Sequence, residues 1–107
     1  MNIQQMMQQA QQMQKRMQEL QAKLANVEVT GQSGGGMVTA TMTCKGEMRK
    51  IKIAAELVSP SDVETLEDLV VAAVNAARRQ ADEHLAGETQ KMMSEFGLPP
   101  GFKLPEF

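Results

Sequence analysis

The N-terminal stretch MNIQQMMQQAQQMQKRMQELQAKLANV, residues 1–27, carries the strongest structural signal in the chain, because its apolar residues recur at alternating steps of three and four. These residues form an apolar seam with two interleaved heptad positions: Ile3, Ala10, Met17 and Leu24 at one, and Met6, Met13, Leu20 and Val27 at the other. The pattern predicts a helix over residues 1–26, on the order of 37 Å long at the usual rise per residue. A chain of 107 residues does not need so long a helix to cover its own core. We therefore expect part of the seam to face another chain, as in a coiled coil, or to extend as an arm.

The residues that follow the long helix predict a three-stranded antiparallel sheet over 27–54. Residues 27–30 alternate between apolar and polar side chains, residues 37–44 do the same, and residues 48–54 form the return strand after a short turn at Lys45-Gly46. Residues 31–36, GQSGGG, are expected to form a loop. One face of the sheet then carries the apolar residues Val38, Ala40, Met42, Cys44, Ile51 and Ile53. The opposite, wetter face carries Thr39, Thr41, Thr43, Lys50 and Lys52.

A second long helix is predicted over 61–96. Ser61 and Glu64 have the spacing of a capping box, and an apolar stripe rich in alanine follows from Leu66 to Ala81. Gly87 is expected to end or bend this helix, with a further helical turn at 91–96. Residues 97–107, GLPPGFKLPEF, are expected to be an irregular, mobile tail. The predicted fold class is α+β, a single domain over 1–96 with the order α-β-β-β-α.

Composition bounds the environment of the protein. Trp and Tyr are absent and only three Phe occur, so the core must be aliphatic, and self-association would help to stabilise it. Cys44 is the only cysteine, which fits a reducing compartment. No apolar run approaches the length of a membrane span, and the N-terminus lacks the pattern of a secretory signal. The simplest assignment is a cytosolic protein of bacterial type.

The charge distribution is compatible with a negatively charged partner, because basic residues are clustered locally. The formal net charge of −2 opposes nucleic-acid binding, which depends on Lys and Arg neutralising phosphates. Charge is uneven, however, because residues 45–52 hold four bases and one acid, whereas residues 56–68 hold five acids and no base. The basic residues that we single out as candidate DNA contacts from charge alone are Lys15, Arg16, Lys23, Lys50, Lys52, Arg78 and Arg79. For each of them singly, an ordinary solvated surface charge is nearly as good an interpretation.

Motifs for other chemistries are weak or missing. The Ser33–Gly36 run lacks the Gly-Lys-Ser/Thr of a phosphate-binding loop, so a flexible connection is the better interpretation. His84 and Cys44 are the only imidazole and thiol, too few ligands for a structural zinc site. The methionines at helical spacing indicate packing rather than metal binding. No nucleophile, base and oxyanion site can be assembled, so we expect no enzyme, no cofactor, no metal and no small-molecule substrate.

Four blocks of sequence together resemble the YbaB/EbfC family of bacterial nucleoid-associated proteins. The blocks are QAQQMQ at 9–14, VTGQSGGG at 29–36, LEDLVVAAVNAA at 66–77 and LPPGFKLP at 98–105, so the resemblance covers nearly the whole chain. The sequence IAAEL at 53–57 departs from the Asp-Pro-Ser common after the third strand of the family, which affects a local turn. The resemblance implies an α-β-β-β-α protomer, a homodimer and DNA binding in the cytoplasm at the nucleoid.

Two functions therefore compete at the level of the sequence. The first is a dimeric, non-enzymatic DNA-binding protein that helps to organise the chromosome and affects transcription. The second is a protein-interaction adaptor that acts through the Met- and Gln-rich heptad helix, which the acidic net charge favours.

Overall fold

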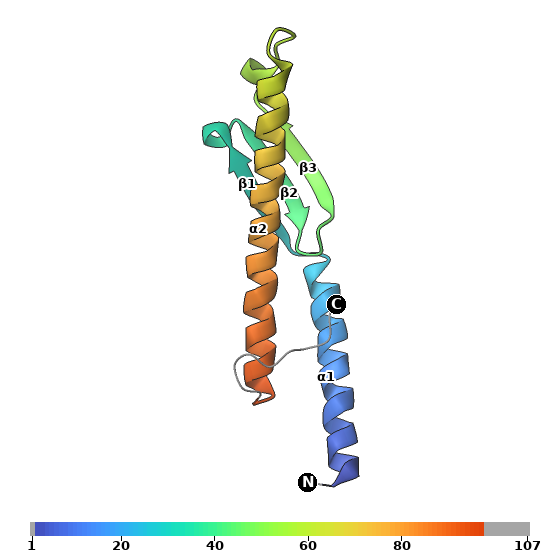
Figure 1. Ribbon diagram of the computed structural model, residues 1–107. Helices are drawn as coiled ribbons and strands as arrows, with labels where there is room; N and C mark the ends of the chain where they lie inside the picture. The colour runs from blue at the N-terminus through green and yellow to red at the C-terminus, as the bar shows by residue number, and fades with distance from the viewer. Residues whose placement is uncertain (1, 98–107) are drawn as a thin grey trace.

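The computed structural model describes residues 2–97 and contains two long helices and one small sheet. The elements follow the order α1 (Ile3–Leu24), β1 (Glu28–Ser33), β2 (Val38–Thr43), β3 (Met48–Ile53) and α2 (Val63–Glu95), with short 3-10 turns at Gly34–Gly36 and Ala55–Leu57. The Cα trace extends 70 × 22 × 16 Å. In Figure 1, the first half of α2 lies across one face of the sheet, and α1 runs away from the sheet beside the second half of α2. The predicted α+β class and element order are confirmed.

The sheet has the strand order β1-β2-β3, with both pairs antiparallel. Its inner face packs on α2 through small side chains, and the cluster formed by Val38, Ala40, Met42, Ala73, Ala77 and Ala81 is at most 4% exposed. Alanine brings a helix close to a sheet because it adds little thickness to the contact. The predicted inner face of the sheet is therefore confirmed for Val38, Ala40 and Met42 but not for Ile51, and the alanine stripe is used within the protomer.

The predicted loop at 31–36 is only half right, since β1 continues to Ser33 before the chain turns. Gly31 is buried in this strand, and a Cβ placed on it would lie 2.1 Å from the Ala77 backbone nitrogen and 2.5 Å from the Ala73 carbonyl oxygen. Here glycine allows the backbones of β1 and α2 to touch. The actual turn is formed by the next three glycines, whose φ angles of 60°, 67° and 93° at Gly34, Gly35 and Gly36 disfavour larger residues. A glycine-rich run can therefore contain both a strand residue and a turn.

The third strand lies at the edge of the sheet and is only partly covered. Helix α2 packs against β1 and β2 and scarcely touches β3. Ile51 and Met48 therefore remain about 40% exposed although both are apolar. On the opposite face Lys50 and Lys52 are exposed, as predicted. Thr43 was predicted on the same wet face but is buried, and its hydroxyl accepts a hydrogen bond from the Glu47 backbone N–H at 3.1 Å.

Two details of α2 differ from the prediction. The N-cap is Asp62 rather than Ser61: the Asp62 carboxylate accepts hydrogen bonds from the Thr65 hydroxyl at 2.8 Å and from the Thr65 N–H at 3.4 Å. The Ser61 hydroxyl instead lies 2.8 Å from that of Ser59. The helix also passes through Gly87 without ending, since i to i−4 hydrogen bonding tolerates a single glycine.

The apolar seam of α1 divides into a covered half and a bare half. Leu20 and Leu24 pack with Cys44 and Met92 in a second, smaller core. Beyond the end of α2 the seam has no cover within residues 2–97, where Ile3 is 75% exposed and Met6 is 56% exposed. The predicted arm is thus present. Residues 98–107, which make up nearly all of the predicted mobile tail, lie outside the described part of the chain.

Candidate nucleic-acid interface

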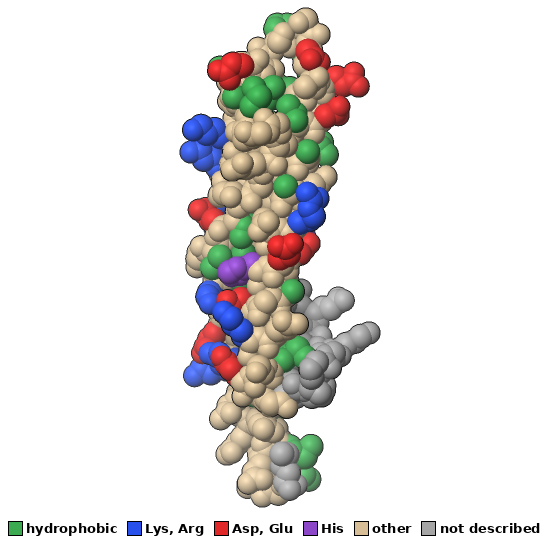
Figure 2. Space-filling view, turned by 90° about the vertical axis from the view of Figure 1, so that its left-hand side faces the viewer, with side chains coloured by type: hydrophobic (Ala, Val, Ile, Leu, Met, Phe, Trp, Pro, Cys, Tyr) green, Lys and Arg blue, Asp and Glu red, His purple; other side chains and the backbone are tan. Residues whose placement is uncertain are grey.

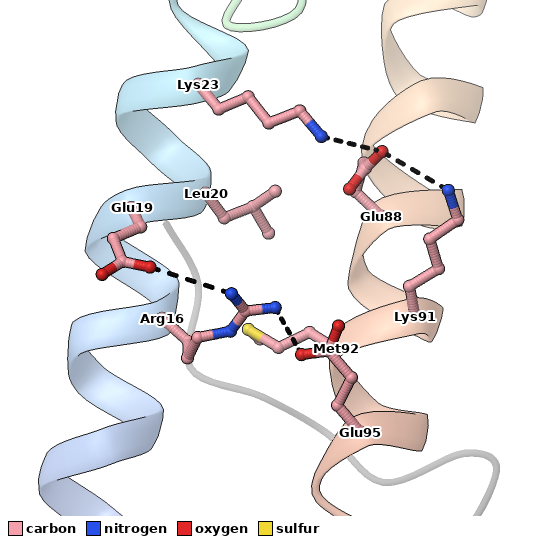
Figure 3. A pocket seen from close by; sticks show the side chains of 8 residues that line it. All are labelled: Arg16, Glu19, Leu20, Lys23, Glu88, Lys91, Met92 and Glu95. Atoms are coloured by element: carbon pink, nitrogen blue, oxygen red, sulfur yellow. Dashed lines mark hydrogen bonds and ion pairs between the residues drawn. The ribbon is translucent and has the colours of Figure 1, made fainter.

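The second half of α1 and the second half of α2 face each other in an antiparallel pair and enclose a charged cavity. Its volume is about 360 Å³, and its lining is drawn in Figure 3. Leu20 and Met92 form its apolar floor, and six charged side chains surround them. We call these six the interhelical charge cluster: Arg16, Glu19, Lys23, Glu88, Lys91 and Glu95.

Ion pairs join the two helices at both ends of this cavity. At one end, the Arg16 guanidinium donates a hydrogen bond to the Glu95 carboxylate and also lies 3.8 Å from Glu19 on its own helix. At the other end, the Lys23 Nζ lies 3.5 Å from Glu88 Oε1, and the Lys91 Nζ lies 3.8 Å from the same atom. Both interhelical pairs bring together residues more than sixty positions apart in the sequence.

Glu88 is the centre of its end of the cluster. Its side chain is only 16% exposed, and His84 Nε2 lies 3.9 Å from it, in addition to the two lysines. A largely buried carboxylate is stable only when cations or donors compensate for its lost hydration, and the ammonium groups of Lys23 and Lys91 do so here. Glu88 also affects its neighbour Cys44: burial, and secondarily the Glu88 charge, raise the pKa of this thiol above its ordinary value of 9.0.

The candidate DNA contacts predicted from charge lie in three separate places. Arg16 and Lys23 come together in the charge cluster, and Lys15 lies beside it, lining a neighbouring cavity with Gln12 and Phe96. On the outer face of the sheet, Lys50 is in register with Thr41, and Lys52 is in register with Thr39. The outer face therefore presents two polar rows, each with an exposed lysine on the edge strand.

The two arginines of α2 form the third place. Arg78 pairs with Asp82 at 3.1 Å and lies against the β2–β3 turn, where a Cβ on Gly46 would approach its Nη1 to 3.0 Å. Arg79 is exposed. On the face seen in Figure 2, Lys and Arg side chains alternate with Asp and Glu instead of forming one continuous basic patch. The structure thus distributes the predicted contacts and does not gather all seven.

Three residues of the charge cluster were missed by reasoning from the sequence: Glu88, Lys91 and Glu95. Their charges are visible in the sequence, but their pairing depends on the register of two helices that a whole sheet separates. Arg49 was also passed over, and its guanidinium donates to the Ala25 carbonyl at 3.4 Å, at the end of α1. This hydrogen bond connects the C-terminal end of α1 to β3.

Within residues 2–97, no three His, Cys, Asp or Glu side chains lie close enough together to hold a metal ion. Over the same range, neither helix has a stretch that is long and apolar enough to cross a membrane.

Comparison with known proteins identifies the family. The model of the YbaB/EbfC DNA-binding family matches residues 1–96. The chain is 57% identical over 104 residues to a nucleoid-associated protein of Rhodospirillum centenum and 53% identical over 104 residues to one of Paramagnetospirillum magneticum, and each match covers 97% of both sequences. The fold is similar to the crystal structure of an uncharacterized Helicobacter pylori protein, with a TM-score of 0.76, 25% identity, and coverage of 87% of this chain and 98% of that one. The long arm, the three-stranded sheet, the alanine-packed second helix and these matches together establish that the chain belongs to the YbaB/EbfC DNA-binding family.

Proposed function

We propose that this protein binds double-stranded DNA as a homodimer and thereby helps to organise the chromosome and affects transcription. The observation that carries this proposal is the match of a DNA-binding family over residues 1–96. The description of this family names DNA binding, which supports a non-enzymatic role for this chain. The relatives are named nucleoid-associated proteins, which places this chain in the cytoplasm at the nucleoid.

The basic side chains make contact with phosphate in this proposal. One group lies on the helices and comprises Lys15, Arg16, Lys23, Arg78 and Arg79, which we call the helix set. The other comprises Lys50 and Lys52, which we call the sheet set. Long, mostly exposed cationic side chains suit phosphate contacts, which position a protein on DNA without reading base edges. Binding should therefore be weakly selective for sequence, and local positive charge compensates for the net charge of −2.

A gel-shift titration of the unsubstituted protein against salt tests DNA binding. Binding by phosphate neutralisation releases counterions, so the observed affinity should fall steadily as salt rises. Affinity that is absent at low salt, or flat across the titration, would refute the proposal.

The dimer is supported by apolar residues that the protomer leaves exposed. They lie on the first half of α1 and on the uncovered strand β3, and include Ile3, Met6, Met7, Met48 and Ile51. The alanine stripe of α2 does not contribute, because Ala73, Ala77 and Ala81 are already buried against the sheet. Light scattering at micromolar protein concentration should report twice the protomer mass, and a monomer at that concentration would contradict the dimer.

A second candidate function, the protein-interaction adaptor, is favoured by one specific feature. A shallow groove of about 350 Å³ on α1 is lined mainly by apolar side chains, including Met7, Ala10, Met13 and Met17. Methionine adapts its shape to varied apolar partners. If the salt titration gives no DNA binding while the arm retains its fold, the adaptor becomes the better explanation.

A further inference from the structure

We propose that Glu95 and Glu88 are built-in competitors of DNA phosphate, which hold Arg16 and Lys23 in the DNA-free protein and release them when DNA binds. This inference rests on the proposed function and adds a regulatory element to it. The carboxylates of α2 occupy the donor groups of α1 that a phosphate would otherwise take.

The competition follows from the geometry of the charge cluster. Arg16 and Lys23 are the two candidate contacts of α1 that meet a carboxylate of the opposite helix, as Figure 3 shows. Carboxylate and phosphate oxygens accept the same charge-assisted hydrogen bonds from guanidinium and ammonium groups. The cluster holds three bases and three acids, so its net charge is zero while the pairs are closed. Opening the pairs toward DNA is what provides positive charge for phosphates.

The pairs are placed so that they can exchange. Arg16 is 47% exposed and Glu95 is 53% exposed, and ion pairs at such exposure are weak and screened by salt. When Arg16 turns to a phosphate, water can hydrate Glu95. When Lys23 leaves Glu88, this more buried carboxylate keeps the ammonium group of Lys91 at 3.8 Å. Neither acid is left buried and uncompensated.

The two helices do not depend on these ion pairs to stay together. Leu20, Leu24 and Met92 are all buried between them, and Cys44 completes that core. Exchange of the charged groups can therefore occur while the apolar contact persists.

A double-mutant cycle on Arg16 and Glu95 tests the inference, with a short labelled DNA duplex and full-length protein. Glu95→Gln should tighten binding by about two- to fivefold, the factor that corresponds to a half-exposed ion pair. Arg16→Gln should weaken it. In the Arg16→Gln background, Glu95→Gln should have no further effect, because nothing remains to compete for. The same logic predicts that Glu88→Gln tightens binding only when Lys23 is present.

Glu83→Gln is the matched control. Glu83 is exposed on the same helix and has no ion-pair partner among residues 2–97, so this change removes one negative charge without releasing a base. Thermal melts of every variant check that each is folded.

Each outcome decides between explanations. Opposite effects of Glu95→Gln and Arg16→Gln, with no additional effect in the double variant, support the competition. If both single changes move affinity in the same direction, the pair acts by orienting the arm, and the inference is wrong. If Glu95→Gln changes DNA affinity only as much as Glu83→Gln does, or changes it equally without Arg16, only the overall electrostatic field has changed. The inference is again wrong in that case. A lack of DNA binding by the unsubstituted protein would instead refute the proposed function, and this inference with it.

Discussion

The two halves of α2 contact the rest of the molecule in opposite ways. The first half lies on the sheet through Ala73, Ala77 and Ala81, so closely that Gly31 is needed beneath it. The second half faces α1 through long side chains, with a small apolar core surrounded by charges. We call the first contact the body and the second the arm contact.

These two contacts differ in how far their atoms can rearrange. Backbones that touch leave no space for rearrangement, because interiors are close-packed and small residues have no rotamers to change. Long charged side chains reach across a gap and can exchange partners at little cost. The body is therefore suited to holding the structure, and the arm contact is suited to meeting a ligand.

The largest expected effect comes from adding one methyl group to the body. Gly31→Ala places a Cβ 2.1 Å from the Ala77 nitrogen, and neither backbone can move aside cheaply. We expect it to lower the free energy of unfolding by about 3 kcal/mol or more, measured by chemical denaturation.

Gly87→Ala is the control for that change, since within residues 2–97 a Cβ built there has no atom within 4 Å apart from its chain neighbours and the local helix backbone. It should raise stability by up to about 1 kcal/mol through helix propensity. Equal tolerance of alanine at both glycines would show that the body contact is not close-packed.

An intermediate effect is expected within the seam of α1. Leu24→Ala removes a side chain that is only 2% exposed and should cost about 2–4 kcal/mol of unfolding free energy. Met6→Ala, on the bare half of the same seam, should change the unfolding free energy of the isolated protomer by less than about 0.5 kcal/mol. Urea titrations at low protein concentration would compare the two. Similar decreases would show that the bare half packs against something in the protomer.

The smallest effect concerns Cys44, which lies in the small apolar core of the arm contact. Because burial raises the pKa of its thiol in the folded protein, the unfolded chain loses that proton first as pH rises. The contribution of the protonated Cys44 thiol to the free energy of unfolding is complete below the ordinary pKa of 9.0 and is lost as pH rises through the folded-state pKa. Cys44→Ala should therefore flatten a small alkaline decline in the unfolding free energy. A decline of equal size in both proteins would assign it to other groups.

Much of the fold could be predicted from the sequence, because the signals were local. The steps of three and four indicated α1, the alternation at Val38–Cys44 indicated β2 with its inner face, and alanine spacing indicated the packed face of α2. Gly31 was misplaced in a loop because its role is a contact with Ala77, forty-six positions away. The N-cap moved to Asp62 because several polar residues competed locally for the same task.

The candidate site was less predictable, because the sequence gives the charge of each side chain but not its ion-pair partner. Arg16 and Lys23 were singled out as candidate DNA contacts from charge alone, whereas the antiparallel register of α1 and α2 brings Glu95 and Glu88 against them. That register depends on the sheet between the two helices. Lys50 and Lys52, by contrast, lie on the outer sheet face where period-two alternation placed them.

The DNA-binding surface is tested by the salt dependence of DNA affinity for three proteins: the unsubstituted chain, a variant with the helix set changed to Gln, and a variant with the sheet set changed to Gln. In a plot of log affinity against log salt concentration, the slope should flatten by about one unit for each phosphate that a variant no longer neutralises. We expect substitution of the helix set, which includes residues of the arm contact, to lower the affinity and to flatten the slope. Substitution of the sheet set should also lower the affinity and should flatten the slope by up to about two units, one for each lysine. If neither variant changes affinity or slope, the assigned DNA-binding surface is wrong.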